Sequence, residues 1–419
     1  MFVDTSALVA ILSGEPEAAA LVARLQQARQ RLGTFACTSS IGPGATNMVT
    51  PLADALMDSI PLVCITGQVP THLIGNDAFQ ECDTVGITRP CTKHNWLVRD
   101  IKDLARVLHE AFYVATSGRP GPVVVDVPKD VQFATGTYHP PRKADVHISY
   151  TPQVKGDPVA IRKAVAMLAG AKRPVIYAGQ GVHWAEAYAE LKELAELLAI
   201  PVCTSLEGKS CFDEMHPLSL GSGGRAYPKA VRSFLDRSDV ILGIGCSFTE
   251  TNFGISMPAG KTIIHATLDP AHLNKDVKIK YGLVGDAKLT LRALVDAAKA
   301  AGARKRDAAP VAAEIKQIAD EWLKEWMPKL TNNEAPLNPY RVLWDLQHTV
   351  DVANTIITHD AGSPRDQLSP FWKTTAPHTY IGWGKTTQLG YGLGLAMGAK
   401  LACPDKLCIN VWGDAAIGF

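Results

Sequence analysis

The chain has 419 residues, of which 47% are hydrophobic, 20% charged and 7% aromatic. This is the composition of an ordinary globular protein, and domains of about 100–200 residues predict two to four of them. Lysine and arginine number 42 against 41 aspartates and glutamates, a formal net charge of +1. Because a balanced charge gives no field that attracts nucleic acid or an anionic membrane, we expect neither as a partner.

The cysteines and the N-terminus indicate the compartment. The nine cysteines are scattered, without a C-x-x-C pair or zinc-ligand spacing, so we expect buried, inert thiols in a reducing environment. No apolar run approaches the about 18 residues of a membrane span. Asp4 stands where a signal peptide carries basic residues. The sequence therefore predicts a cytoplasmic protein.

Short apolar, β-branched runs recur along the chain, each followed by a helix-like stretch such as 185–198. Continuous apolar runs are typical of strands that are covered on both faces, as in a parallel sheet. Repeated alternation of such strands with helices predicts an α/β fold. The predicted strands are 34–38, 61–66, 122–127, 174–178, 200–204, 240–244, 262–268, 355–358 and 407–412.

Two polar, proline-bearing stretches, 135–158 and 301–339, divide the chain. We expect three consecutive parallel-sheet α/β domains at 33–135, 158–300 and 335–419, preceded by a separate piece at 1–32. The last segment stops directly after a strand and turn. We therefore expect an altered first domain and an incomplete last one.

Glycine-rich turns are the first candidate sites. The turn 41–47, IGPGATN, brings backbone N–H groups to a ligand or is simply a tight turn. Further glycines at 179–181, 221–224 and 243–245 either face a dinucleotide or only end parallel strands. Gly413-Asp414, after a predicted strand, either binds a divalent cation or caps a turn. His94 and His359 lie near strand ends, in a site or in the core.

Several longer motifs occur in a fixed order. They are GPGATNMVTPLADALMDSIPLVCITGQVP, IGNDAFQECDTVGITRPCTKHNWLV, GRPGPVVVDVPKDVQ, RPVIYAGQGV, and GWGKTTQLGYGLGLAMGAKLA leading to NVWGDAAIGF. Together they make residues 33–419 resemble thiamine-diphosphate-dependent enzymes of the acetolactate synthase large subunit type. The resemblance implies a transferase of branched-chain amino acid biosynthesis that decarboxylates and joins 2-keto acids of the pyruvate class.

The resemblance also implies cofactors, partners and site residues. It implies thiamine diphosphate and Mg²⁺, with FAD possible in the family but not indicated here, and a homodimer or homotetramer. Leu389 would be the apolar pivot under the cofactor, and Asp414 the metal ligand. The other implied cofactor residues are Gly44, Asn47, Gly362, Ser363, Gly390, Gly413 and Ala415, with Gly42 and Thr46 in the same loop as Gly44; Phe79, Gln80 and Lys93 are implied for the substrate pocket.

Three departures from the family pattern bear on activity. Ala415 stands where the family has a glycine, and no asparagine pair follows it. No catalytic residue is matched, since the flanks of Glu15 and Glu17 differ from those of the family's glutamate. Residues 1–28 instead resemble the opening of a PIN-domain ribonuclease, with Asp4 as one metal ligand. We therefore expect an enzyme fragment of impaired activity; the alternatives are a non-catalytic scaffold or pseudoenzyme and, more remotely, a PIN-type ribonuclease.

Overall fold

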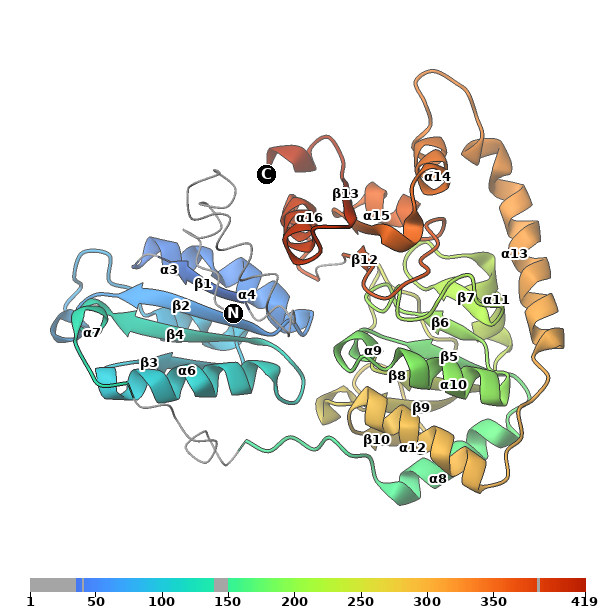
Figure 1. Cartoon of the computed structure of the whole chain (residues 1–419), viewed down its shortest axis with the longest axis horizontal. Coiled ribbons are helices and arrows are strands. Elements are labelled where there is room, and N and C mark those ends of the chain that lie inside the picture. The colour runs from blue at the N-terminus through green and yellow to red at the C-terminus, as the bar shows by residue number, and fades with distance from the viewer. Residues whose placement is uncertain (1–34, 40, 139–149, 383–384) are drawn as a thin grey trace. The chain divides into compact units, whose positions relative to one another are not determined.

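The computed structural model describes residues 35–39, 41–138, 150–382 and 385–419. They form two compact units: the described parts of Met1–Pro152 with Gly384–Thr387, and those of Gln153–Trp383 with Gln388–Phe419. The first unit contains one sheet and the second contains two, and every strand pair in all three sheets is parallel (Figure 1). The predicted parallel α/β fold is confirmed.

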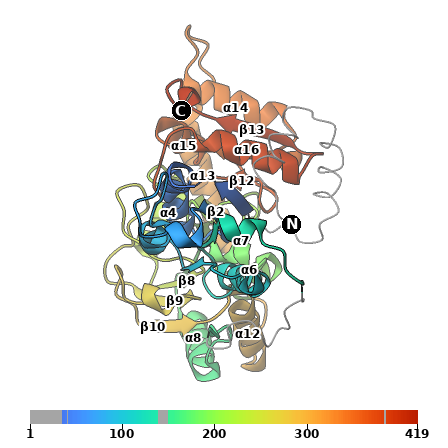
Figure 2. The ribbon, with the colours of Figure 1, turned by 90° about the vertical axis from the view of Figure 1, so that its left-hand side faces the viewer.

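The sheet of the first unit has the strand order β1-β2-β4-β3. Alternate residues of its central strands face opposite sides, so Val123 and Val125 pack with α6 whereas Val124 packs with α4. These helices lie on the two faces of the sheet, and Figure 2 shows the same ribbon turned by 90°. The elements are β1 (Phe35–Ser39), α3 (Pro43–Asn47), α4 (Val49–Met57), β2 (Leu62–Gln68), α5 (Thr84–Thr88), β3 (His94–Leu97), α6 (Ile101–Thr116), β4 (Pro122–Pro128) and α7 (Lys129–Phe133).

The larger sheet of the second unit, here called the central sheet, has the order β10-β9-β8-β5-β6-β7. Ile176 and Leu242 face a core that includes α8, α10 and α12, whereas Val175 and Ile241 face the core under α11. Both faces are therefore covered, as the apolar runs predict. The elements are α8 (Pro158–Gly170), β5 (Pro174–Ala178), α9 (Gly181–Trp184), α10 (Tyr188–Leu198), β6 (Val202–Thr204), β7 (Ser219–Ser222), α11 (Lys229–Arg237), β8 (Val240–Ile244), β9 (Thr262–Thr267), β10 (Tyr281–Val284) and α12 (Ala287–Ala300).

The smaller sheet of the second unit, here called the C-terminal sheet, has the order β12-β11-β13. Its core contains Ile357, Leu368 and Trp372 together with Leu206, which comes from the loop after β6. The two sheets of this unit thus share apolar packing. The elements are α14 (Pro339–Thr349), β11 (Thr355–His359), α15 (Ser363–Leu368), β12 (Tyr380–Ile381), α16 (Tyr391–Ala402) and β13 (Leu407–Val411).

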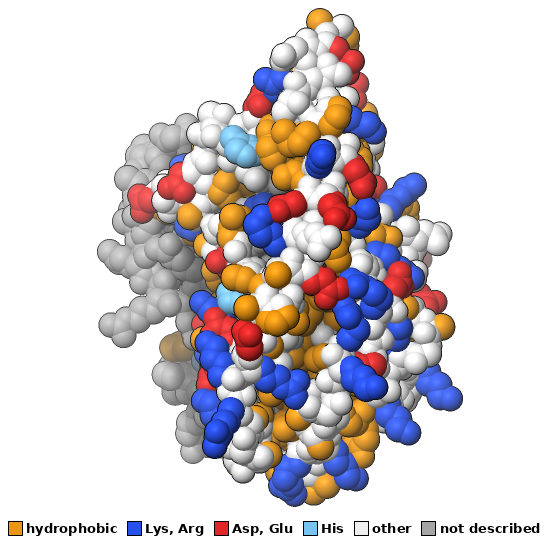
Figure 3. Space-filling model, turned by 90° about the vertical axis from the view of Figure 1, so that its right-hand side faces the viewer, with side chains coloured by type: hydrophobic (Ala, Val, Ile, Leu, Met, Phe, Trp, Pro, Cys, Tyr) orange, Lys and Arg blue, Asp and Glu red, His pale blue; other side chains and the backbone are white. Residues whose placement is uncertain are grey.

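The long helix α13 (Ala309–Leu330) joins the two sheets of the second unit. Glu314 pairs with Arg173 beside the central sheet at 2.7 Å, and Trp322 stacks on Phe371 with 5.1 Å between ring centroids. On the face shown in Figure 3, side chains of both charge signs are mixed with small apolar patches. Among the described helices, none is long and apolar enough to cross a bilayer.

The end of α10 generates a stability prediction. Ala199 closes this helix in the left-handed region at φ 51°, where a Cβ costs about 1 kcal/mol. We therefore expect Ala199→Gly to raise the free energy of unfolding by about 0.5–1 kcal/mol, measured by urea denaturation. Gly302, after α12, has φ 81° with no atom within 4 Å of where a Cβ would stand, so Gly302→Ala is the matched control and should lower stability. Equal stability of both variants would contradict this account.

Candidate functional site

The carboxyl ends of β11 and β13 meet at one edge of the C-terminal sheet. His359 pairs with Val411, and the Asp360 N–H donates to the Val411 carbonyl at 3.0 Å. Just beyond these strand ends, the chain reaches Gly362 and Gly413. The parallel sheet therefore brings together two of the predicted cofactor segments, at the edge where ligands of open α/β sheets bind.

Asp360 anchors the start of α16 at this edge. Its side chain is fully buried and accepts the N–H groups of Ala361 at 2.8 Å, Gly390 at 3.0 Å and Gly392 at 3.2 Å. A carboxylate at a helix N-terminus satisfies otherwise unpaired donors and interacts favourably with the helix dipole. Asp360 thus fixes the backbone on either side of the start of α16, directly after Leu389.

The first turn of α16 packs closely on the two strands. A Cβ at Gly392 would lie 2.6 Å from Asn410 Oδ1 and 2.8 Å from the His359 carbonyl oxygen, so only glycine fits there. Gly390 has φ 89°, and a Cβ on it would lie 2.9 Å from the Phe419 carbonyl oxygen. The turn that follows Gly413 therefore folds back against the start of α16. This contact brings the third predicted cofactor segment to the same place.

Side chains and backbone at this edge fit a diphosphate with a divalent cation. Nothing lies within 4 Å of where a Cβ would stand on Gly362 or Gly413, so backbone is open there for a ligand. Ser363 and Asp414 are exposed, and Leu389 is 40% exposed beside Gly390. Hydroxyl, backbone N–H and carboxylate are the groups that bind phosphate oxygens and Mg²⁺.

Asp414 is the carboxylate that the sequence analysis predicts as the metal ligand at this edge. Asp414 is exposed, and one of its carboxylate oxygens accepts the N–H of Ala415 at 3.0 Å. Within the described ranges, no three His, Cys, Asp or Glu side chains are grouped as a metal site. Asp414 therefore fits as a single ligand, with phosphate and water oxygens needed to complete the usual coordination of Mg²⁺.

In the first unit, the glycine-rich turn contacts the loop that carries Gln80. Gly42 has φ 54°, and a Cβ on it would lie 2.3 Å from the Gln80 carbonyl oxygen, so the close approach requires glycine. Gly44 is half-buried and Asn47 is exposed, both within α3. The structure thus brings the predicted turn and the predicted substrate loop together.

Loop 75–83 is held by side chains that the sequence analysis did not select. The Glu81 carboxylate accepts the N–H of Ala78 at 2.9 Å and that of Gly75. Gln68 Nε2 donates to the Cys82 carbonyl at 2.7 Å and to Asp126 Oδ2 at 3.0 Å. These contacts fix both ends of the loop.

Phe79 and Lys93 differ sharply in their surroundings. Phe79 is 88% exposed at the tip of loop 75–83. Lys93 lies at the opposite, amino edge of the sheet, where its N–H donates to Pro122 at the start of β4. Its ammonium group donates to the carbonyls of Val114 and, at 2.7 Å, Ser117 at the end of α6. The structure therefore does not bring Lys93 to Gly42 and Gln80, and its role in a substrate pocket stays a prediction.

Asp126 lies at the centre of the buried polar group behind this loop. It is 1% exposed and accepts the Thr66 hydroxyl at 2.7 Å as well as the Gln68 amide. Burial raises the pKa of Asp126 to about 6, although the hydrogen bonds from Thr66 and Gln68 act in the opposite direction. In the sequence, Asp126 stands out as the single aspartate inside the apolar run of β4. Asp360 stands out in a similar way, directly after the apolar strand β11 of the C-terminal sheet.

Family comparisons agree with the three-sheet architecture. Models of the thiamine pyrophosphate enzymes match the chain in order: the N-terminal TPP binding domain at 9–87, the central domain at 161–294 and the C-terminal TPP binding domain at 360–419. The first match begins inside the segment 1–32, and nothing in these matches supports the resemblance of that segment to a PIN-domain ribonuclease. Asp4, Glu15 and Glu17 lie outside the described residues, and the exact domain limits stay predictions.

Individual relatives match over most of the chain. A probable acetolactate synthase large subunit of Methanocaldococcus jannaschii is 40% identical over 428 residues, covering 98% of this chain and 70% of that protein. The large subunit of acetolactate synthase isozyme 3 of Escherichia coli is 35% identical, covering 94% and 68%. The acetolactate synthase large subunit of Corynebacterium glutamicum is 38% identical, covering 90% and 60%.

Asp126 generates a pH prediction. Its pKa of about 6 in the folded chain exceeds its ordinary 3.8, so the folded state binds the proton more tightly. Stability from this group is therefore present at low pH and is lost as pH rises from about 4 through about 6. We expect wild type to lose about 3 kcal/mol of unfolding free energy over this window relative to Asp126→Asn, measured by urea denaturation. A difference between the two proteins that does not change with pH would contradict this.

Asp360 generates a second prediction. In Asp360→Asn, an NH₂ group replaces one carboxylate oxygen, so its donors face either the N–H of Ala361 or the N–H groups of Gly390 and Gly392. We expect a loss of about 2 kcal/mol in unfolding free energy, measured by urea denaturation. The control is Asp366→Asn, which removes the half-buried carboxylate that accepts from Arg365 at 2.8 Å without touching α16. If the control costs as much as Asp360→Asn, the anchoring of α16 is not the cause.

Proposed function

Because this chain belongs to the acetolactate synthase large subunit family of thiamine-diphosphate enzymes, we propose that it decarboxylates and joins 2-keto acids of the pyruvate class. The observation that carries the proposal is the edge of the C-terminal sheet. There, Asp360 holds the start of α16 while the backbone of Gly362 and Gly413 and the Asp414 carboxylate stay open to a ligand. A transferase role in branched-chain amino acid biosynthesis follows from this reaction.

The chain's own groups have distinct tasks in this reaction. When bound, thiamine diphosphate supplies the carbon nucleophile and the electron sink that decarboxylation of a 2-keto acid requires. Asp414 would hold Mg²⁺, and the backbone of Gly362 and Ser363 at the adjacent strand end would hold the diphosphate. Leu389 presents an apolar side chain that Gly390, held by Asp360, keeps in place. Phe79 and Gln80 line the approach of the 2-keto acid.

We further propose a homodimer or homotetramer in the cytoplasm as the working form. An aromatic ring that is 88% exposed on a hydrogen-bonded loop, as Phe79 is, favours a partner surface over bulk water. The cysteine side chains that the structure describes form no disulfide and are mostly buried, which suits a reducing compartment. Activity is proposed to be impaired, since Ala415 stands where the resemblance implies a glycine, directly after the proposed metal ligand Asp414. A non-catalytic scaffold is the outcome if the cofactor does not bind at all.

Calorimetric titration of the chain with thiamine diphosphate and Mg²⁺, together with acetolactate formation from pyruvate, tests the proposal. We expect Mg²⁺-dependent binding, and Asp414→Ala should weaken it at least about tenfold because a hard oxygen ligand is lost. The matched control is Asp405→Ala, an exposed aspartate of the same unit before β13. Absence of any binding by the wild-type chain would overturn the proposed activity, and equal binding by both variants would remove Asp414 from the metal site.

A further inference from the structure

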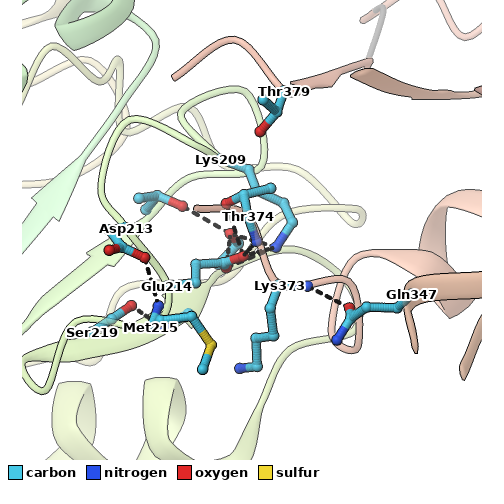
Figure 4. A network of polar contacts seen from close by, with 12 residues as sticks. Lys209, Asp213, Glu214, Met215, Ser219, Gln347, Lys373, Thr374 and Thr379 are labelled. Atoms are coloured by element: carbon cyan, nitrogen blue, oxygen red, sulfur yellow. Dashed lines mark hydrogen bonds and ion pairs between the residues drawn. The ribbon is translucent and has the colours of Figure 1, made fainter. Parts of the chain in front are cut away.

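The loop after β6, residues 205–216, carries a buried ion pair. The side chains of Lys209 and Glu214 are 1% and 3% exposed, and Lys209 Nζ lies 2.6 Å from Glu214 Oε2. The Ser222 hydroxyl donates to the other carboxylate oxygen at 3.1 Å. Figure 4 shows Lys209, Glu214 and Thr374 close together, with dashed lines converging on the Glu214 carboxylate.

Glu214 also binds the segment that leads into β12, residues 373–381. Its Oε2 accepts the Thr374 N–H at 2.8 Å and the Thr374 hydroxyl at 3.0 Å. In return, the Glu214 N–H donates to the Thr374 carbonyl at 2.9 Å. Thr374 is fully buried, so these hydrogen bonds have no competition from water. One end of segment 373–381 is therefore fixed to the loop.

The other end of this segment contacts the same loop. The Lys209 ammonium lies 5.4 Å from the centroid of the Tyr380 ring, a cation–π distance. Leu206 packs into the core cluster that contains Tyr380 and Ile357. Loop 205–216 thus holds segment 373–381 at both ends, by polar contacts at Thr374 and by mixed contacts at Tyr380.

A continuous series of contacts leads from this segment to the cofactor edge. Tyr380 pairs with Ile357 in β11, and the Ile357 N–H donates to the Thr379 carbonyl at 2.9 Å. Shortly after Ile357 comes Asp360, whose carboxylate binds Gly390 and Gly392. The position of β11 therefore determines the position of the start of α16.

The energetics favour a role in position over one in stability. Burial alone would raise the pKa of Glu214, but Lys209 and Lys373 outweigh burial and hold that pKa below its usual range. A buried ion pair is a poor stabiliser compared with apolar side chains of the same volume, because both ions lose their hydration. It is, however, directional, since Glu214 Oε2 accepts both the N–H and the hydroxyl of Thr374.

We propose that Glu214, with Lys209 as its counterion, is a positioning residue that sets β11 and β12 and thereby the Asp360-anchored start of α16. The inference rests on the proposed function only for the identity of the ligand at that edge. The central sheet, through loop 205–216, thus adjusts the geometry of the cofactor site without touching the cofactor.

Hydrogen exchange of the unliganded full chain, read by mass spectrometry on a peptide covering 388–393, tests the proposal. The main variant, Lys209→Met with Glu214→Leu, removes both charges but keeps apolar volume. We expect it to stay folded with a lower melting temperature, because the buried Thr374 and Ser222 donors lose their acceptor, while the Gly390 and Gly392 amides exchange at least about tenfold faster. A peptide over β8, Val240–Ile244, should exchange as in wild type.

Two further variants make the outcome decisive. Thr374→Val removes only the hydrogen bond from the Thr374 hydroxyl to Glu214, and exchange at 388–393 should become about threefold faster. If the double variant does not fold, this variant tests the proposal in its place. Glu193→Gln removes the carboxylate that accepts from Arg292 at 2.7 Å and from Lys299 on the outer helices, and should change nothing at 388–393. Wild-type exchange in the folded double variant, or in Thr374→Val if the former does not fold, overturns the proposal.

Cofactor titration of the same variants separates this inference from the proposed function. If the wild-type chain binds thiamine diphosphate, the folded double variant should bind it at least about tenfold more weakly at a temperature well below its melting transition. If the wild-type chain binds none, the proposed function fails, but the exchange rates still decide whether Glu214 positions α16. Unchanged affinity in a folded double variant of a binding-competent chain counts against the proposal.

Discussion

A carboxylate taken out of water must find donors for its oxygens, and the site geometry of the second unit depends on how Asp360 meets this requirement. Its donors are backbone N–H groups at the start of α16, so satisfying the charge also fixes a helix. Leu389 and Gly390 lie directly before this helix, which begins at Tyr391. A single electrostatic constraint at the end of one strand therefore places residues that lie far along the chain from it.

The same solution recurs in the first unit with a different geometry. The Asp126 carboxylate accepts hydrogen bonds from the side chains of Thr66 and Gln68. Gln68 also donates to the Cys82 carbonyl and so links Asp126 to loop 75–83. Here the consequence is a fixed loop rather than a fixed helix. Because the raised pKa of Asp126 reflects incomplete compensation of burial, this support carries a cost in stability at neutral pH.

Several of the strands that the sequence predicts, such as β4, β5 and β8, are buried along their whole length. Each predicted run matches a strand to within two residues, whereas β3, β7, β10 and β12 were not predicted. All four are edge strands, and they contain residues such as His94, Ser219 and Gly282 that break an apolar run. At an edge, hydrogen bonding to one neighbour suffices to form the strand, and this pairing leaves no local pattern in the sequence.

The residues of the candidate site likewise differ in whether the local sequence indicates them. The meeting of the segments that carry Gly362 and Gly413 was predictable because turns after parallel strands converge on one edge. The cofactor roles of these glycines and of Asp414 stay predictions. Glu214 and Thr374 were not predictable, because their partnership joins residues 160 positions apart and neither is unusual locally. The buried pair loses hydration, which apolar residues in its place would not. Its presence is therefore explained by what it orients, the strands β11 and β12 of the C-terminal sheet. In the second unit, the buried charges of Asp360 and Glu214 therefore set the positions of backbone segments. The apolar contacts of Leu206 with the core of the C-terminal sheet provide the stability.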